Sequence, residues 1–226
     1  GSTNYYARIR AINAGVYSNN STSLLTTTDC NAIPAVALPW TESFENQTLF
    51  TYKIFPSCWK NEVTGSNQSS AWYLTNTYAS TGTKSISSIY NTNSWAFTPR
   101  FALTAGVAYD FSFMQRSWFG GYVLPLGVYA GSQANSVSMT DTLGTFANVT
   151  AQSGFVKRTF TYIPKTTGEY SFGVNTTASS TNFDYYFFDD FKHEVIQLLY
   201  AFHRMFQPRK ANSVAGFFIS WLTKIR

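Results

Sequence analysis

The sequence predicts an all-β protein, a jelly-roll β-sandwich of two antiparallel sheets, and three observations support this. Between residues 70 and 191, short runs alternate apolar and polar side chains, with turn residues between them and no helical period. In one such run, Ala108–Gln115, the residues Tyr109, Phe111 and Phe113 fall on one face. Many short strands separated by turns are typical of sandwiches and jelly rolls. Finally, 18% of the residues are aromatic and 12% are charged, which suits an aromatic core beneath a neutral surface.

The first 39 residues predict a hairpin followed by a linker. Tyr5–Ile12 and Ser23–Thr27 are alternating runs, and Gly, Asn and Ser residues between them favour a turn. A hairpin alone is at best marginally stable in water. Residues 29–39 contain Pro34 and Pro39 and predict a domain boundary.

The expected strands of the main domain then follow in close succession. They are Thr41–Asn46, Ala71–Leu74, Lys84–Tyr90, Ser94–Phe101, Ala108–Gln115, Tyr122–Tyr129, Val137–Leu143, Phe155–Ile163, Tyr170–Asn175 and Tyr185–Phe191.

The last of these strands combines the most apolar stretch of the chain with two adjacent acids, Asp189 and Asp190. Side chains alternate across a strand, so the two carboxylates are expected on opposite faces, one of them facing the interior. A buried carboxylate is costly unless it is paired, hydrogen-bonded or bound to a metal.

The composition changes after Phe191. Apolar residues now recur at helical spacing until Pro208, at Val195, Leu198, Leu199, Phe202 and Phe206. Three explanations remain open for residues 193–226: a basic amphipathic segment that lies on an anionic membrane, a segment packed on the N-terminal hairpin, and the product of a frameshift or wrong gene end.

The net charge of +5 comes entirely from this end of the chain. From residue 192 onward there are six bases and the single acid Glu194, which leaves ten bases and ten acids in residues 1–191. The body is therefore neutral, and no basic patch predicts binding to nucleic acid.

The two cysteines, Cys30 and Cys58, predict one disulfide in an exported protein, the alternative being two free buried thiols. No signal peptide is visible at Gly1, so the chain is expected to be an internal piece of a longer secreted or cell-surface protein. No apolar run reaches the length of about 18 residues that a membrane-spanning helix needs.

Several stretches together resemble one family. They are Pro39–Glu45, Pro56–Trp59, Ser94–Pro99 and Phe183–Phe191, which ends in Phe-Phe-Asp-Asp-Phe. Their order and spacing resemble the cleaved-adhesin or MAM-like jelly-roll domains of Bacteroidetes surface proteins. Tyr5–Ala11 with Leu24–Thr27 resembles the last strands of a fibronectin type III domain, although an ordinary hairpin of the next domain would read similarly.

The resemblance implies a domain plan and a metal site. Residues 1–28 would be the end of a truncated fibronectin type III domain, 29–39 a linker, 40–192 the jelly roll and 193–226 an atypical tail. Related jelly rolls carry a structural calcium, here implied for Glu45 with Asp189 or Asp190, and calcium favours such oxygen ligands. The alternative is a surface Asp and an Asp bonded to loop amides, without metal.

The same residues argue against an enzyme. No histidine precedes His193, so the predicted jelly roll lacks the base of a Ser-His-Asp or Cys-His arrangement and the histidines of most zinc sites. Several acids could form a glycosidase pair, but no spacing places two of them across a cleft. They are Glu42, Glu45, Glu169, Asp184, Asp189 and Asp190.

The chain is instead expected to bind glycans or host surface and matrix proteins, beside neighbouring domains of the same chain. Sugar-binding sandwiches present exposed aromatic rings, and Trp118, Phe119 and Tyr122 surround a turn-forming Gly pair, with Trp72 as a second candidate. The alternative for each is a core aromatic. A purely structural spacer domain is the rival function.

Overall fold

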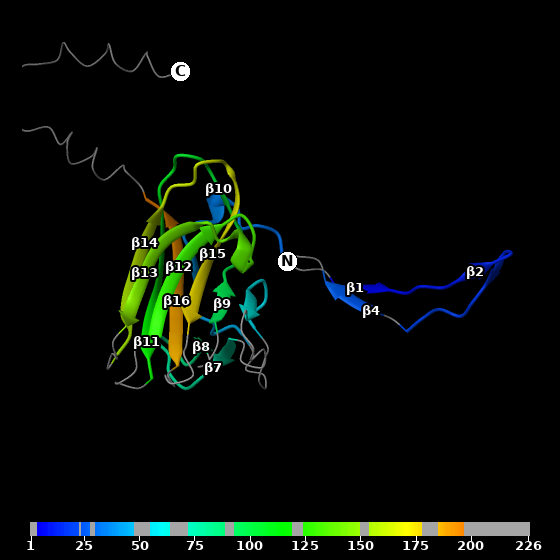
Figure 1. The fold of residues 1–226 in the computed structure, drawn as a ribbon, viewed down its shortest axis with the longest axis horizontal. Helices are drawn as coiled ribbons and strands as arrows, with labels where there is room; N and C mark the ends of the chain where they lie inside the picture. Colours follow the sequence, from blue (N-terminus) through cyan, green and yellow to red (C-terminus); the bar gives the residue numbers. More distant parts are fainter. Residues whose placement is uncertain are drawn as a thin grey trace, which may run out of the picture. The chain divides into compact units, whose positions relative to one another are not determined.

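The structure, a computed structural model, describes residues 4–22, 24–27, 30–47, 55–63, 72–88, 93–118, 124–149, 154–177 and 185–196. Almost all regular structure in these ranges is β-strand, and only Ala35–Ala37 and Ser136–Ser138 form short 3-10 turns. Two antiparallel sheets pack face to face, which confirms the predicted all-β sandwich (Figure 1).

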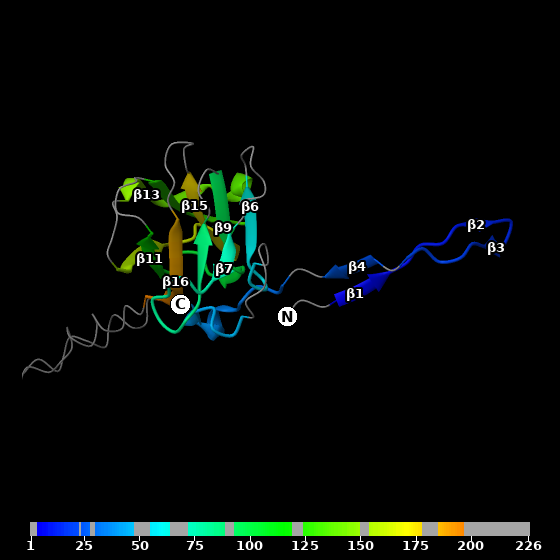
Figure 2. The same ribbon diagram turned by 90° about the horizontal axis from the view of Figure 1, so that it is seen from below.

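The first sheet has the strand order β13 (Asp141–Val149), β12 (Leu124–Gly131), β15 (Gly168–Thr177), β9 (Asn93–Phe97) and β6 (Lys60–Val63), and β10 (Phe101–Leu103) also pairs with β15. The second has the order β14 (Val156–Tyr162), β11 (Tyr109–Ser117), β16 (Tyr186–Val195), β8 (Ser85–Ser88) and β7 (Tyr73–Thr75), and β5 (Trp40–Glu42) also pairs with β16. Figure 2 shows the two layers, with β13, β15, β9 and β6 in one and β11, β16 and β7 in the other.

Aromatic rings fill the space between the sheets. Phe111 of β11 stacks on Phe172 of β15 with ring centroids 4.4 Å apart and planes within 9°. Such contacts add to the burial of large apolar surfaces, which is the main stabilising term of a core. The largest fully buried side chains are Trp72, Tyr109, Tyr186, Phe44, Phe97, Phe101, Phe111, Phe113, Phe172, Phe187, Phe188 and Phe191.

A β-bulge interrupts the alternation of the closing strand β16. Ser112 pairs with Lys192 whereas Met114 pairs with Asp189, so β16 has one residue more than β11 between these pairs. Asp190 has a φ of 48°, a left-handed conformation that suits the extra residue of a bulge. The prediction that one aspartate faces the interior is therefore wrong. Tyr186 and Phe188 face the core before the bulge, Phe191 faces it afterwards, and Asp189 lies on the outer face beside Phe187.

Several expected strand limits differ in the structure. The strand expected over 41–46 ends at Glu42, because Phe44 has a φ of 62° and its backbone N–H donates to Glu42 Oε1 at 2.6 Å, which turns the chain. Strand β13 begins at Asp141 rather than Val137, since Ser136–Ser138 form a 3-10 turn capped by Asn135. Strand β16 continues to Val195, beyond the boundary expected at 192.

The N-terminal residues form the predicted hairpin. Strands β1 (Asn4–Ala7) and β4 (Leu24–Thr27) pair, and β2 (Ile12–Asn13) and β3 (Val16–Tyr17) pair around a two-residue turn. Ala14 and Gly15 have φ values of 47° and 82°, as the turns favoured in two-residue hairpins require.

The disulfide between Cys30 and Cys58 is present, with the two Cα atoms 5.5 Å apart, which confirms the predicted pairing. Ile33 is also fastened to the sandwich, since its N–H donates to Arg100 O at 2.7 Å and its carbonyl accepts from Ala102 N at 2.9 Å. The expected linker is thus attached to the jelly roll along part of its length. The tail from residue 197 lies outside the described residues. Within those that are described, no helix has the length and apolar character needed to cross a bilayer.

Candidate functional site

Asp189 holds one end of the loop that connects β7 to β8. Its side chain is fully buried, and its Oδ2 accepts hydrogen bonds from Ser80 N at 2.7 Å and Thr81 N at 3.2 Å. Its Oδ1 accepts from Asp190 N at 2.7 Å, and Asp190 Oδ1 accepts from the Thr81 hydroxyl at 2.5 Å. These bonds satisfy the buried carboxylate, as in the alternative of an Asp bonded to loop amides.

Glu45 holds the other end of the same loop. Its Oε1 accepts from Thr83 N at 2.9 Å and Lys84 N at 2.7 Å, and its Oε2 accepts from the Thr83 hydroxyl. In return, Lys84 Nζ donates to the carbonyls of Glu45 and Gln47. We call Tyr78–Lys84 the clasped loop, because carboxylates from two distant parts of the chain bind its backbone.

The surroundings shift the pKa values of these acids in opposite directions. Burial raises the pKa of Asp189 to about 6, although the three backbone N–H groups act to lower it. Hydrogen bonds from the N–H groups of Thr83 and Lys84 lower the pKa of Glu45. Among described residues, no three His, Cys, Asp or Glu side chains gather as a metal-binding group. Hydrogen bonds alone account for these acids, and the calcium ion stays a prediction.

A pocket of about 580 Å³ opens on the outer face of the second sheet, beside the clasped loop. We call it the outer groove. Nine of its eleven lining residues carry a hydroxyl or a charge and the other two are Met114 and Phe191, so it offers the mixed donors and acceptors that a sugar hydroxyl needs beside apolar surface. It is lined by Thr41, Glu42, Ser43, Ser80, Thr81, Ser112, Met114, Lys157, Asp190, Phe191 and Lys192.

The same sheet face carries a cluster that we call the aromatic patch, made of Tyr78, Arg116, Trp118, Tyr185 and Phe187. The ring of Trp118 lies 5.0 Å from Tyr185, 6.0 Å from Phe187 and 6.3 Å from Tyr78, between centroids. Phe187 is fully buried beneath this cluster, whereas 36% of Trp118 is exposed. Of the predicted binding residues, Trp118 therefore does present a ring surface to solvent. Phe119 and Tyr122 lie outside the described residues.

The outer groove and the aromatic patch adjoin along one strand. Met114 lines the groove and Arg116 belongs to the patch, and they are successive outward positions of β11, paired with Asp189 and Phe187 of β16. The clasped loop contributes to both, through Ser80 and Thr81 at the groove and through Tyr78 at the patch. The sequence missed the groove, because its residues come from five segments that share no local pattern.

Trp72 belongs to the core and not to a binding surface. Its ring is fully buried 5.0 Å from that of Phe188, and its Nε1 donates to Ser94 Oγ at 3.0 Å. The expectation that Trp72 meets a ligand is corrected accordingly, since no part of the ring is exposed.

His193 also lies in the core, which corrects its predicted place in the tail. Its ring is fully buried, 4.5 Å from that of Phe101 and 4.8 Å from that of Phe172, and Nδ1 lies 3.2 Å from the carbonyl of Asp110. Burial lowers its pKa to about 4, and Nε2 has no hydrogen-bond partner. The jelly roll thus does contain a histidine, but one enclosed by aromatic rings and out of reach of a substrate.

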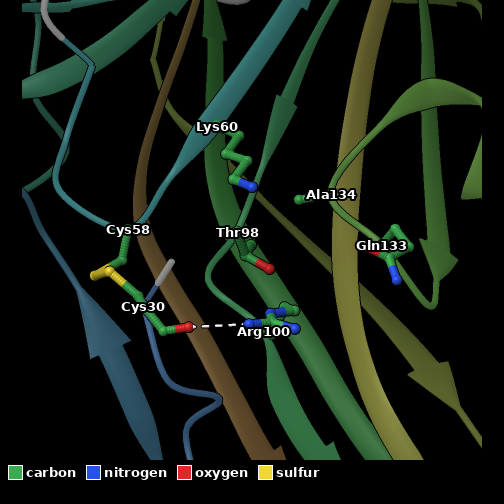
Figure 3. Close-up of a pocket in the computed structure, with 7 residues that line it drawn as sticks. All are labelled: Cys30, Cys58, Lys60, Thr98, Arg100, Gln133 and Ala134. Atoms are coloured by element: carbon green, nitrogen blue, oxygen red, sulfur yellow. Dashed lines mark hydrogen bonds between the residues drawn. A yellow bond between two sulfur atoms is a disulfide. The ribbon is translucent and has the colours of Figure 1, made fainter. Parts of the chain in front are cut away.

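A second, much smaller pocket lies beside the disulfide (Figure 3). Its cavity volume of about 30 Å³ is enough for about one water molecule. Arg100 fills one side, with Nη2 bonded to the carbonyl of Cys30 at 3.2 Å and Nη1 paired with Glu169 at 2.6 Å. This pocket is too small for a sugar.

Known structures share this arrangement of sheets. The K1 cleaved adhesin domain of Lys-gingipain from Porphyromonas gingivalis W83 aligns with a TM-score of 0.55 and 18% identity, over 70% of this chain and 98% of that one. This chain has the cleaved adhesin fold. The K3 domain gives a TM-score of 0.53 at 19% identity, covering 69% and 96% of the two chains, and the K2 domain gives 0.52 at 14% identity, covering 70% and 98%.

No family model matches the sequence, and neither does any curated protein. At these identities the likeness to cleaved adhesin domains establishes the fold alone. The MAM-like and fibronectin type III assignments stay predictions.

Proposed function

We propose that this cleaved adhesin fold is a non-catalytic binding module of a secreted or cell-surface protein, and that it binds glycans on the outer face of its second sheet. The observation that carries the proposal is the adjacency of the partly exposed Trp118 ring and the hydroxyl-lined outer groove. An aromatic ring offers a flat apolar surface to the C–H face of a sugar, while the groove offers donors and acceptors to its hydroxyls.

The chain could also bind a host surface protein through the glycans that such proteins commonly carry, which is a broader form of the same proposal. The gingipain domains are described as adhesin domains, which agrees with a binding role for this chain without naming a ligand. Two features argue for binding rather than catalysis. His193 is enclosed in the core, and the acids Glu42 and Asp190 of the groove already accept hydrogen bonds from Phe44 N and the Thr81 hydroxyl.

A glycan array probed with the wild type and with Trp118→Ala tests the proposal. Loss of a stacked ring is expected to weaken binding about 30-fold, since aromatic contacts at binding hot spots commonly contribute about 2 kcal/mol. Trp95→Ala is the matched control, because Trp95 is a partly buried Trp stacked on Phe97 and lies on the outer face of the opposite sheet.

The expected result is that Trp118→Ala loses signal and Trp95→Ala keeps it, with thermal melts showing that both variants fold. Loss of binding in Trp95→Ala alone would move the site to the other sheet. No glycan signal from the wild type would instead favour a structural spacer domain.

A further inference from the structure

We infer that the glycan recognised by this face carries an oxyanion, a carboxylate or a sulfate ester, and that Arg116 binds it at the edge of the aromatic patch. The inference rests on the proposed function and names the ligand class for the same site.

The guanidinium of Arg116 is held in place by stacking. Its Cζ lies 3.7 Å from the centre of the Tyr78 ring, and its Nε is buried without a hydrogen-bond partner. Tyr78 is itself positioned by an edge-to-face contact with Phe187, with ring centroids 5.1 Å apart. A stacked guanidinium loses little further freedom when it binds, which favours affinity for a planar acceptor.

The charge of Arg116 has no acidic partner among the residues that the structure describes. Arg100, in contrast, pairs with Glu169 at 2.6 Å, whereas Arg158 also stacks on a ring with its Nε buried and unpaired but donates from Nη2 to Gln115 at 3.4 Å. A partly buried cation without an anion gains most from a ligand that supplies one.

Trp118 directly follows β11, and its N–H continues the pairing with the neighbouring segment by donating to Tyr185 O at 3.0 Å. At the rise of a strand, Arg116 and Trp118 are therefore roughly 7 Å apart. That spacing suits one sugar ring stacked on Trp118 while an oxyanion on the same or the next ring meets the guanidinium fork. The fork geometry matches the two oxygens of a carboxylate or a sulfate.

The outer groove also carries cations, two lysines beside two acids. Lys157 and Lys192 both line it, and the acids that accompany them are already engaged by donors within the fold. Lys192 also pairs with Glu194 at 2.7 Å, which leaves Lys157 as the lysine of the groove without an ion pair among the described residues. A second acidic sugar further along a chain would meet Lys157.

Titration calorimetry with three oligosaccharide probes tests the inference on the intact chain. The probes are a galacturonic-acid oligomer, a sulfated galactan oligomer and a neutral galactan oligomer, each measured at low and high salt. We expect Arg116→Met to weaken binding of the acidic probe about 10- to 100-fold, because charged hydrogen bonds contribute about 1.5–3 kcal/mol. Arg116→Lys keeps the charge but not the forked donor geometry, so its affinity should lie between those of the wild type and Arg116→Met.

Arg10→Met is the matched control, since Arg10 stacks on Tyr17 at 4.0 Å in the N-terminal hairpin and its removal deletes the same charge and the same kind of contact. It should bind as the wild type does. Preference for the carboxylated or the sulfated probe identifies which oxyanion is recognised. Thermal melts of all variants separate loss of binding from loss of fold, and Arg116→Lys keeps the test valid if Arg116→Met is unstable.

Two outcomes overturn the inference. In one, Arg116→Met folds and binds the acidic probes as tightly as the wild type does. In the other, the wild type binds the neutral probe as tightly as the acidic ones, and Trp118→Ala weakens both. That result would support the proposed glycan binding and reject the oxyanion as part of the ligand. Absence of binding to all three probes and to the array would reject both proposals together.

Discussion

His193 and Asp189 are single residues whose surroundings move their pKa values in opposite directions. Burial among aromatic rings lowers the pKa of His193 to about 4, although Asp110 and Glu194 act to raise it. Burial beneath the clasped loop raises that of Asp189 to about 6. As the pH falls from about 6.5 to 4, the unfolded state binds a proton at His193 that the folded state refuses, so this group removes stability. As the pH falls from 6 to 4, the folded state binds a proton at Asp189 before the unfolded state does, so Asp189 adds stability. The two effects partly cancel.

We therefore predict that His193→Leu reveals a pH dependence that the wild type hides. Relative to wild type, the free energy of unfolding of the variant should rise as the pH falls from 7 to 4, by at most about 3 kcal/mol. Urea denaturation at several pH values measures this difference. A difference that stays constant across the range would contradict the lowered pKa.

Asp189→Asn tests the other residue. An amide supplies one acceptor oxygen in place of two, so at least one of the N–H groups of Ser80, Thr81 and Asp190 loses its partner. We predict a loss of about 1–3 kcal/mol in the free energy of unfolding at neutral pH. Thr161→Val is a suitable control, because it removes only an exposed hydrogen bond to Asp110 on the same sheet. Equal stabilities of the two variants would argue against the role given to Asp189.

At the scale of elements, the clasped loop and the bulge of β16 depend on each other. Asp189 lies on the outer face just before the bulge, where its carboxylate binds the loop backbone, and the bulge places Asp190 where it accepts from the Thr81 hydroxyl. Glu45 binds the far end of the same loop. The loop in turn supplies Ser80 and Thr81 to the outer groove and Tyr78 to the aromatic patch. The shape of the candidate site therefore rests on two carboxylates, Asp189 and Glu45, that do not line the groove.

The predicted calcium ion can be tested at these carboxylates through its coupling to pH. Calcium requires ionised ligands, so any stabilisation by millimolar calcium should grow as the pH rises from 5 to 7 and should vanish in Asp189→Asn. Melting temperatures with calcium and with a chelator measure it. If hydrogen bonds alone hold the loop, the two melting curves will coincide at every pH.

At the scale of the whole molecule, the disulfide joins the segment before β5 to the start of β6 and closes a loop with a sequence separation of 28. A crosslink of that span restricts the unfolded chain by about 3–4 kcal/mol. We predict that Cys30→Ser with Cys58→Ser lowers the free energy of unfolding by roughly this amount, measured by urea denaturation. Reducing agent should lower the melting temperature of the wild type and leave that of the double variant unchanged.

The sequence alone predicted the all-β class, most of the strands and the disulfide, and it named Trp118 as a candidate exposed ring with a core position as the alternative. These follow from local alternation, turn residues and the small number of possible cysteine pairs, which need no knowledge of distant contacts. It also offered the alternative of an Asp bonded to loop amides, which Asp189 matches.

Only the tertiary structure decided which face of the sheet is occupied by each residue of β16 from the bulge onward. One extra residue at Asp190 shifts the alternation of β16, so Asp190 stays out of the core and His193 enters it. Likewise, Trp72 and Trp118 have similar local sequences, yet one is enclosed between the sheets and the other lies on the outer face. The outer groove needed the fold as well, because hydrogen bonds between segments more than 100 residues apart bring its walls together.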